Sequence, residues 1–284
     1  MAVCVELGII SVEMATQLIV NADDFGRSAS VNAAVGRARR EGILTSASLM
    51  VTGGAADEGA SLARETPGLA VGLHLALSRR DPIRAALRYY FHRAARRRLE
   101  PEVEAQFEAF ARTGLQLSHV DGHQHLHAHP AVLPVVIELA VRYGAHGIRI
   151  PREPLWPNLR ADRSRPAYKL VTALGQAYLS IVCRRLVRDG RLVTCNAVIG
   201  GLMSGGMTDS YVIEMLKRLD CRSIELYFHP AEPGNCKTDP FGPNPGDLEA
   251  LLSHDLRRFV SEKGFELTNY AGLKRRQEGA HARR

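Results

Sequence analysis

Short apolar segments alternate with segments of helical periodicity along most of the chain, and this alternation restricts the fold more than any other feature. Strands are predicted at residues 18–21, 43–51, 69–75, 117–121, 147–150, 195–199 and 223–228. Helices are predicted at residues 30–42, 55–65, 130–143, 170–186, 209–219 and 248–260, and another begins at Pro101. Strands that alternate with helices favour parallel pairing, so we expect an α/β fold with about seven parallel strands closed, or nearly closed, into a barrel.

The composition is that of one globular domain. Hydrophobic residues make up 45% of the 284 residues and charged residues 24%, which excludes extensive disorder and a coiled coil. No internal repeat or linker divides the chain, so we expect a single domain over residues 17–270. Residues 1–16 are expected to be disordered or an over-extended start, and residues 271–284 a basic tail. No apolar stretch is long enough to predict a membrane-spanning helix.

The cysteines and the net charge exclude two further classes. The five cysteines are odd in number, contain no Cys-x-x-Cys pair, and are predicted to be reduced thiols of a cytoplasmic protein: Cys4, Cys183, Cys195, Cys221 and Cys236. Eight arginines and one acid between Arg79 and Arg98 carry the whole net charge of +7, so the remainder is neutral. A basic patch confined to one window argues against a nucleic-acid-binding protein, which would bind across its fold.

Polar residues follow four of the predicted strands at the point where each strand ends. These segments are Asn21–Gly26, Gly72–His74, His119–Pro130 and Tyr227–Pro230. Barrel enzymes place their chemistry at the carboxyl ends of the strands, so we expect these side chains to converge there.

Asp23 and Asp24 are adjacent carboxylates that follow an apolar strand. Because side chains alternate along a strand, a turn must splay the two before both can serve one site. One carboxylate can then bind a metal while the other takes a proton from the attacking water. The alternative is that the pair caps the following helix.

Five histidines occupy alternate positions: His119, His123, His125, His127 and His129. If the segment is extended, this spacing places several of them on one face. Neutral imidazole is a common ligand of divalent transition metals, which favours a metal site over a surface histidine tract. Three protein ligands are usual in a catalytic site, so not all five can bind the ion. His74 and His229 alone resemble ordinary core and loop histidines, but both stand at strand ends.

The motifs Asn21-Ala22-Asp23-Asp24-Phe25-Gly26, Gly72-Leu73-His74, Asp121–His127 and Phe228-His229-Pro230 together resemble the YdjC-type carbohydrate deacetylase family. The segments Arg88–Phe110 and Ile150–Pro154 are similar to the branch associated with hopanoid biosynthesis. The resemblance implies a distorted, polysaccharide-deacetylase-like (β/α) barrel with one divalent metal ion, zinc or magnesium. It also implies that the protein removes the acetyl group from an N-acetylated sugar.

The same resemblance implies roles for individual residues. Asp24, His74 and His123 would hold the metal, and Asp23 would be the base. His229 would protonate the departing amine or stabilise the oxyanion. The residues implied to contact substrate or to support the metal ligands are Asp121, His125, His127 and Arg149.

The hopanoid branch implies an N-acetylglucosaminyl group on a membrane lipid as the substrate. Residues 79–98, with Tyr89, Tyr90 and Phe91, and the apolar segment 170–186 would then contact an anionic membrane at its cytoplasmic face. The alternative is a solvated arginine-rich helix face and a buried helix. A homodimer is a further assembly open to the chain.

Two other enzyme readings stay open. One is deacetylation of soluble chito-oligosaccharides. The other is a different metal-dependent barrel amidohydrolase or phosphoesterase, although such enzymes carry His-x-His at the first strand, where this chain has Asp23-Asp24.

Overall fold

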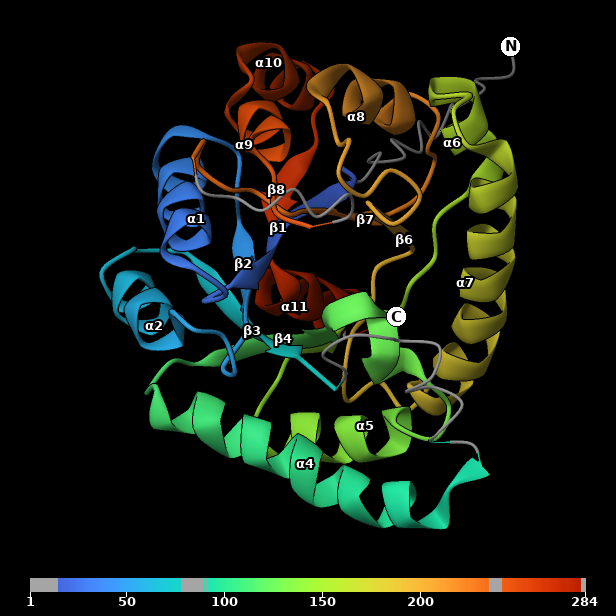
Figure 1. The fold of residues 1–284 in the computed structure, drawn as a ribbon. Helices are drawn as coiled ribbons and strands as arrows, with labels where there is room; N and C mark the ends of the chain where they lie inside the picture. Colours follow the sequence, from blue (N-terminus) through green and yellow to red (C-terminus); the bar gives the residue numbers. More distant parts are fainter. Residues whose placement is uncertain (1–14, 78–88, 90, 235–241, 282–284) are drawn as a thin grey trace, which may run out of the picture.

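The computed structural model describes residues 15–77, 89, 91–234 and 242–281 (Figure 1). Its strands are β1 (Gln17–Phe25), β2 (Ser46–Leu49), β3 (Ala70–Leu75), β4 (Leu117–Gly122), β5 (Gly147–Ile148), β6 (Ala197–Ile199), β7 (Ser223–Phe228) and β8 (Glu266–Thr268). The helices before β6 are α1 (Ala29–Glu41), α2 (Ala56–Arg64), α4 (Arg93–Arg112), η1 (His123–Ala128), α5 (Leu133–Arg142), α6 (Leu155–Ala161) and α7 (Pro166–Leu186). Those after β6 are α8 (Asp209–Leu216), α9 (Pro245–Leu252), α10 (His254–Glu262) and α11 (Tyr270–His281).

The sheet is parallel and curls into an incompletely closed barrel. Its strand order is β5-β4-β3-β2-β1-β7-β6, and β8 pairs with the first residues of β1. The two ends of this row approach each other, because Gly147 in β5 bridges Val193 and Val198 N in β6 donates a hydrogen bond to Arg152 O. The predicted distorted (β/α) barrel is thereby confirmed.

Each strand presents one face to the surrounding helices and the other to the barrel interior. In β7, Ile224, Leu226 and Phe228 join the large apolar cluster beneath the helices, whereas Tyr227 belongs to a smaller cluster that includes Tyr270. Glu225 shares the face of Tyr227 and is fully buried. The strand alternation therefore directs polar side chains into the interior, where the candidate site lies.

A β-bulge shapes the end of β1. Ala22 pairs with Ala47 and Phe25 with Leu49, so β1 holds one extra residue between these pairs. Asp24 has φ of 61°, a left-handed conformation that aspartate tolerates better than most residues. The predicted strand of residues 18–21 is thus too short, and the bulge within the strand, rather than a turn after it, splays Asp23 and Asp24.

The histidine run is not extended beyond β4, so the condition under which its alternate histidines would share one face is not met. Residues His123–Ala128 form the 3-10 segment η1, in which Gln124 and His125 have φ of 55° and 58°. The alternate histidines therefore do not share one face. Only His119 lies in a strand, β4.

Several boundaries also differ from the predictions. Helix α4 starts at Arg93 and contains Pro101, which does not begin it. The residues from 271 that were expected to form a basic tail are helical through His281, and α11 is anchored by buried Tyr270 and Leu273. Cys183, Cys195 and Cys221 are free thiols, as predicted.

Part of the basic window falls outside the described residues, namely 79–88 and 90, as do residues 1–14 of the predicted N-terminal segment. Tyr89, expected in a membrane-facing segment, is instead a core residue with 2% of its surface exposed, whereas Phe91 is exposed. Among the described helices, none has the length and hydropathy needed to cross a membrane.

Candidate metal centre

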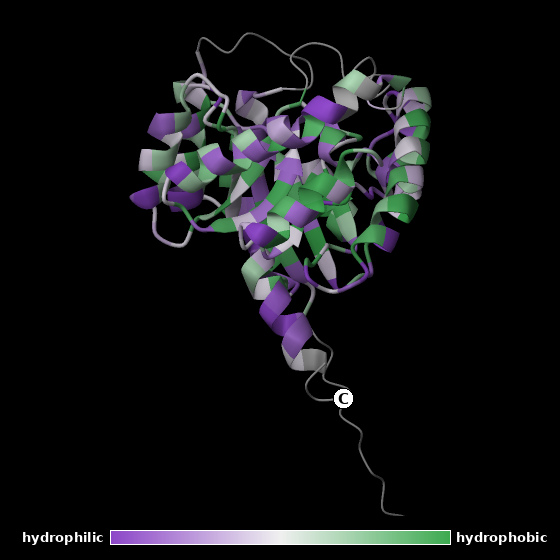
Figure 2. Ribbon diagram, turned by 90° about the horizontal axis from the view of Figure 1, so that it is seen from below, coloured by the Kyte–Doolittle hydropathy of each residue, from purple (hydrophilic) through white to green (hydrophobic). Residues whose placement is uncertain are grey.

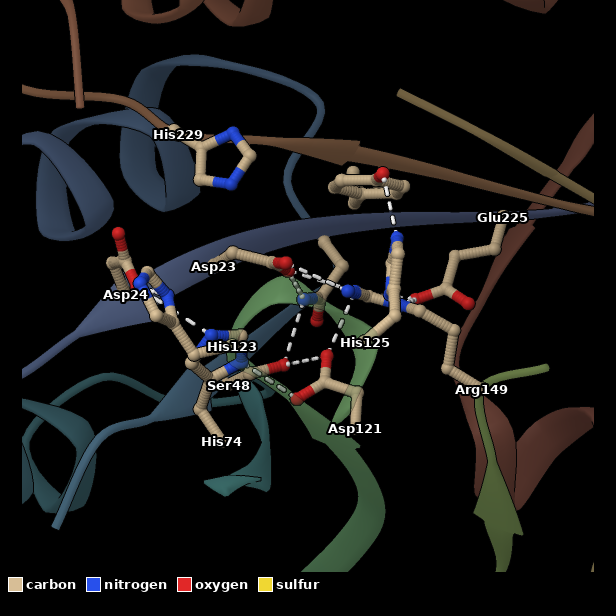
Figure 3. Close-up of polar contacts among 12 residues, drawn as sticks. Asp23, Asp24, Ser48, His74, Asp121, His123, His125, Arg149, Glu225 and His229 are labelled. Carbon is tan, nitrogen blue, oxygen red and sulfur yellow. Dashed lines mark hydrogen bonds and ion pairs between the residues drawn. The ribbon is translucent and has the colours of Figure 1, made fainter. Parts of the chain in front are cut away.

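The predicted site residues converge at the carboxyl ends of the strands, as Figure 3 shows. Asp23 and Asp24 come from the bulged end of β1, His74 from β3 and Asp121 from β4. His123 begins η1 directly after β4, Arg149 directly follows β5, and His229 directly follows β7. Parallel strands bring these side chains together because all their carboxyl ends open onto one side of the sheet.

Asp24, His74 and His123 form an Asp–His–His cluster. Asp24 Oδ1 lies 3.4 Å from His74 Nε2 and 3.2 Å from His123 Nδ1. One ligand atom from each residue can be chosen so that all three lie within 4.8 Å of one another. Asp24 and His74 are buried, and His123 is partly exposed. Burial alone would raise the pKa of Asp24, but the facing imidazoles of His123 and His74 hold it well below its usual value.

The Asp–His–His cluster fits a divalent ion. Asp24 Oδ1 is buried and has no hydrogen-bond partner among the described residues, whereas Oδ2 accepts a 2.7 Å bond from Arg27. One carboxylate oxygen and two imidazole nitrogens thus point into the same space. This donor set is typical of zinc and similar transition metals.

Asp121 fixes the orientation of His74. Its Oδ1 lies 2.8 Å from His74 Nδ1, while its Oδ2 accepts a 2.7 Å hydrogen bond from the Ser48 hydroxyl. Burial opposes the charging of His74, but the charge of Asp121 and its hydrogen bond raise the pKa of His74 to about 10. The contact at Nδ1 leaves Nε2 directed at Asp24, an arrangement that commonly supports metal-binding histidines.

Asp23 belongs to a different group, the arginine cluster of Asp23, Asp121, Arg149 and Glu225. The buried Arg149 donates to both carboxylate oxygens of Asp23, at 2.6 and 2.7 Å. It also donates to Glu225 Oε1 at 3.0 and 2.9 Å, and its Nη2 lies 2.8 Å from Asp121 Oδ2. Glu225 Oε2 accepts a 2.6 Å hydrogen bond from the Tyr270 hydroxyl.

Arg149 is the single cation of the arginine cluster, and the pKa values of its carboxylates shift in different directions. Burial acts to raise the pKa of Asp23, yet Arg149 outweighs it and the pKa is lowered. For Glu225 burial prevails, so its pKa is raised despite the same guanidinium. Asp23 is therefore ionised at neutral pH. Its Oδ1 also accepts from Asn21 Nδ2, which leaves more free acceptor capacity on Oδ2.

His229 lies opposite Asp23 and Asp24 in Figure 3. Its backbone N–H donates a 2.8 Å hydrogen bond to Asp247 Oδ2, which ties the end of β7 to α9. The ring lies 5.8 Å from that of Tyr227, and its buried Nδ1 has no hydrogen-bond partner in the described chain. This imidazole can exchange a proton with a molecule held between it and the two aspartates.

Two other histidines of the run, His125 and His127, make hydrogen bonds to neighbouring parts of the barrel. His125 Nε2 lies 3.0 Å from the Tyr227 hydroxyl, and His127 Nε2 donates a 2.8 Å bond to Arg149 O. Burial lowers the pKa of His125 to about 3 and that of His127 to about 4, so both are neutral. Neither joins a group of ligands close enough for a metal within the described residues.

Sequence reasoning missed four residues that shape the site: Ser48, Glu225, Asp247 and Tyr270. Glu225 carried a usable signal, because it is a lone acid between apolar residues of a predicted buried strand. Ser48 carried none, since serine is common in strands and loops alike.

The fold is an incompletely closed parallel barrel, and its site combines an Asp–His–His cluster with a carboxylate bound to arginine. Residues 17–262 match the family described as YdjC-like protein. The chain belongs to this YdjC-like family.

Two relatives agree with this assignment, and a solved structure shares the fold. The chain is 32% identical over 268 residues to a carbohydrate deacetylase of Geobacillus stearothermophilus, covering 89% of this chain and 96% of that protein. It is 27% identical to a chitooligosaccharide deacetylase of Enterobacter sp., covering 90% and 98%. A solved structure from Enterococcus faecalis, described as a cellobiose-phosphate cleavage protein, superposes with a TM-score of 0.66 at 22% identity, covering 91% and 99%. That structure supports the fold alone.

Proposed function

We propose that this protein is a metal-dependent hydrolase that removes the N-acetyl group from an N-acetylglucosamine-containing substrate. The observation that carries the proposal is the Asp–His–His cluster, whose three ligand atoms converge beside the ionised, arginine-bound Asp23. The relatives described as carbohydrate and chitooligosaccharide deacetylases support the reaction class.

Asp24, His74 and His123 are the proposed metal ligands, and Asp121 is the residue that orients His74. A divalent ion held there would lower the pKa of water and polarise the acetyl carbonyl. Two imidazoles in the donor set favour zinc over magnesium.

Asp23 and His229 are the proposed acid–base pair. Asp23 accepts, on Oδ2, a proton from the water that attacks the carbonyl carbon. His229, on the opposite side, donates a proton to the amine as the C–N bond breaks. Acetate and the free amino sugar are the products, so no serine or cysteine nucleophile is needed. Arg149 acts by holding Asp23 ionised and in place, while His125 and His127 support the wall of the site.

We propose an N-acetylglucosaminyl hopanoid lipid as the substrate, processed at the cytoplasmic face of the membrane. Support for it comes from the sequence segments Arg88–Phe110 and Ile150–Pro154, which are similar to the hopanoid-associated branch. The relatives described as chitooligosaccharide deacetylases favour the alternative, a soluble sugar.

Acetate release tests both the reaction and the substrate. Purified protein loaded with zinc or magnesium is offered N-acetylglucosaminyl hopanoid and, separately, di-N-acetylchitobiose. Release from the glycolipid alone supports the lipid substrate, and release from the soluble sugar alone replaces it with the alternative. If neither substrate yields acetate with either metal, the deacetylase proposal is wrong.

A further inference from the structure

Helix α7 exposes an apolar face. Five large apolar residues of this helix are 46–71% exposed: Leu170, Val171, Leu174, Tyr178 and Ile181. At 100° per residue, these positions fall within an arc of about 100°, so they form one stripe, the apolar face of α7. In Figure 2 the green residues of this helix lie at the right-hand edge of the molecule. Water-exposed helices normally carry polar residues on such a stripe.

The opposite side of α7 is buried and anchored by polar contacts, so the helix cannot turn its apolar face inward. Lys169 is buried, and its Nζ donates a 2.7 Å hydrogen bond to Asp162 O. Gln176 Oε1 accepts a 3.1 Å bond from Glu153 N. Cys183 Sγ lies 3.2 Å from Ala128 O, the last residue of η1. These anchors would lose their partners if the helix rotated.

Exposed arginines stand at both ends of the apolar face, and no acid lies between them. Arg163 and Arg165 precede the helix, Arg185 lies in its last turn, and Arg188 follows it; all four are exposed. From Arg163 to Arg188 the chain contains no aspartate or glutamate. A stripe of apolar residues with cationic ends is typical of helices that lie in the plane of a membrane interface.

We propose that the apolar face of α7 docks on the surface of an anionic lipid bilayer. The apolar side chains would enter the headgroup region while the arginines at both ends contact anionic lipid. Tyr178 suits this position, because its ring is apolar and its hydroxyl polar.

Charge favours a bilayer over a second copy of the chain. If two copies paired these faces antiparallel about a twofold axis, Arg163 and Arg165 of one copy would lie beside Arg185 and Arg188 of the other. This arrangement brings four cations together at each end, where the flanking acids Asp162 and Asp189 are already paired with Lys169 and Arg191. An anionic lipid surface offers the opposite charge at both ends.

Docking through α7 would bring the candidate site close to the lipid. The helix contacts η1 through Cys183, and η1 begins with His123 of the Asp–His–His cluster. Binding to lipid does not depend on the proposed reaction. Only the further step, delivery of a lipid-linked sugar to the site, rests on the proposed function.

Flotation with lipid vesicles tests the docking surface. The full chain is mixed with phosphatidylcholine vesicles and with vesicles that also contain phosphatidylglycerol, in the absence of any substrate. The wild type is expected to float with the anionic vesicles and less with the neutral ones. The triple variant Val171→Ser/Leu174→Ser/Ile181→Ser should lower partitioning at least about tenfold. Arg185→Glu/Arg188→Glu should lower it at least about fivefold for each arginine.

Matched controls lie elsewhere on the surface. Leu267→Ser changes an exposed leucine of β8, and Arg257→Glu reverses an exposed arginine of α10; neither should alter flotation. All changed residues are exposed, so circular dichroism should show unchanged folding. Failure of the wild type to float with either vesicle, or equal flotation of the triple variant, overturns the proposal.

Moving the single tryptophan onto α7 allows its fluorescence to report contact between the apolar face of α7 and lipid. Trp156 is the only tryptophan of the chain. In the variant Trp156→Phe/Leu174→Trp, the sole indole stands on the apolar face, and its emission should shift to the blue with anionic vesicles. The control Trp156→Phe/Leu267→Trp should not shift. An unshifted emission from position 174 contradicts docking through this face.

Sedimentation without lipid tests whether a second copy of the chain, rather than a bilayer, covers the apolar face of α7. We expect a monomer, or an oligomer that the triple variant leaves intact. If the triple variant dissociates a dimer, the apolar face of α7 is a contact between copies and the proposal is wrong. None of these assays requires turnover, so a failed acetate-release test leaves their outcome readable.

Discussion

Two neighbouring carboxylates occupy opposite electrostatic environments in this site. Asp23 lies in the arginine cluster, where a buried guanidinium donates to both of its oxygens. Asp24, the next residue, faces two imidazoles and has one oxygen with no hydrogen-bond partner among the described residues. Arg149 donates to both oxygens of Asp23, whereas Arg27 donates only to Oδ2 of Asp24 and leaves Oδ1 facing the imidazoles.

This difference explains how adjacent residues can have different roles. A carboxylate already bound to Arg149 is a poor ligand for a second cation, but it stays ionised and can accept a proton. Asp24 has a cationic partner only at Oδ2, from Arg27, while its buried Oδ1 faces two imidazoles, so a divalent ion bound at Oδ1 would stabilise it. The bulge of β1 and the left-handed φ of Asp24 create the difference by turning the two side chains apart.

Removing the charge of Asp24 is the strongest test of the comparison. Asparagine tolerates the left-handed backbone of this position, so Asp24→Asn should fold normally. We expect bound metal to fall well below one ion per chain and the rate of acetate release to fall at least about 10³-fold, since the metal supplies several kcal/mol of stabilisation. Elemental analysis and acetate assays measure the two effects.

Asp57→Asn, on the exposed side of α2, is the matched control and should change neither quantity. If Asp24→Asn still binds one metal ion per chain, Asp24 is not a ligand, and the two carboxylates do not have the different roles proposed here.

The sequence predicted which residues form the candidate site better than it predicted the backbone conformation that positions them. His74 lies at the end of a predicted strand, Asp24 and His123 lie just after one, and parallel pairing alone brings strand ends together. The left-handed backbone of Gln124 and His125 depends on tertiary contacts that no local pattern encodes. The contact between Glu225 and Arg149 depends on sheet curvature, because β7 and β5 are far apart along the strand order and meet only when the barrel curls. The sequence also did not show whether α7 is buried or exposes its apolar face, because buried helices and helices at a membrane interface can have the same composition.

Arg149→Met tests the arginine cluster. The substitution leaves buried carboxylates without their cation, so the free energy of unfolding should fall by about 3–5 kcal/mol. It should also raise the pKa of Asp23, because burial would no longer be outweighed. Urea unfolding measures the first effect. The control Arg142→Met breaks an exposed pair with Glu104 and should cost at most about 1 kcal/mol. Equal losses for the two variants would mean that the buried cluster contributes nothing special.

Acid should destabilise the barrel beneath both clusters through His119. Burial lowers the pKa of this histidine from 6.5 to about 4, so the unfolded chain takes up a proton before the folded protein does. The contribution is fully present above pH 6.5 and is lost as the pH falls toward 4, by about 3 kcal/mol in total. Unfolding measured across this range should show a shallower pH slope in His119→Gln than in the wild type. An unchanged slope would contradict the neutral state of His119.

Tyr270→Phe gives the smallest expected effect and separates the two clusters most cleanly. It removes the hydroxyl that donates to Glu225 Oε2 but keeps the ring that stacks on His119. The loss of a hydrogen bond to a buried carboxyl should lower the free energy of unfolding by about 1–2 kcal/mol. Because the arginine cluster has its own cation, this loss should be the same in metal-loaded and metal-stripped protein, as urea unfolding of both forms can determine. Tyr143→Phe, a partly buried tyrosine outside the site, should cost less in either form. A loss that appears only in the metal-loaded protein would mean that the two clusters act as one unit.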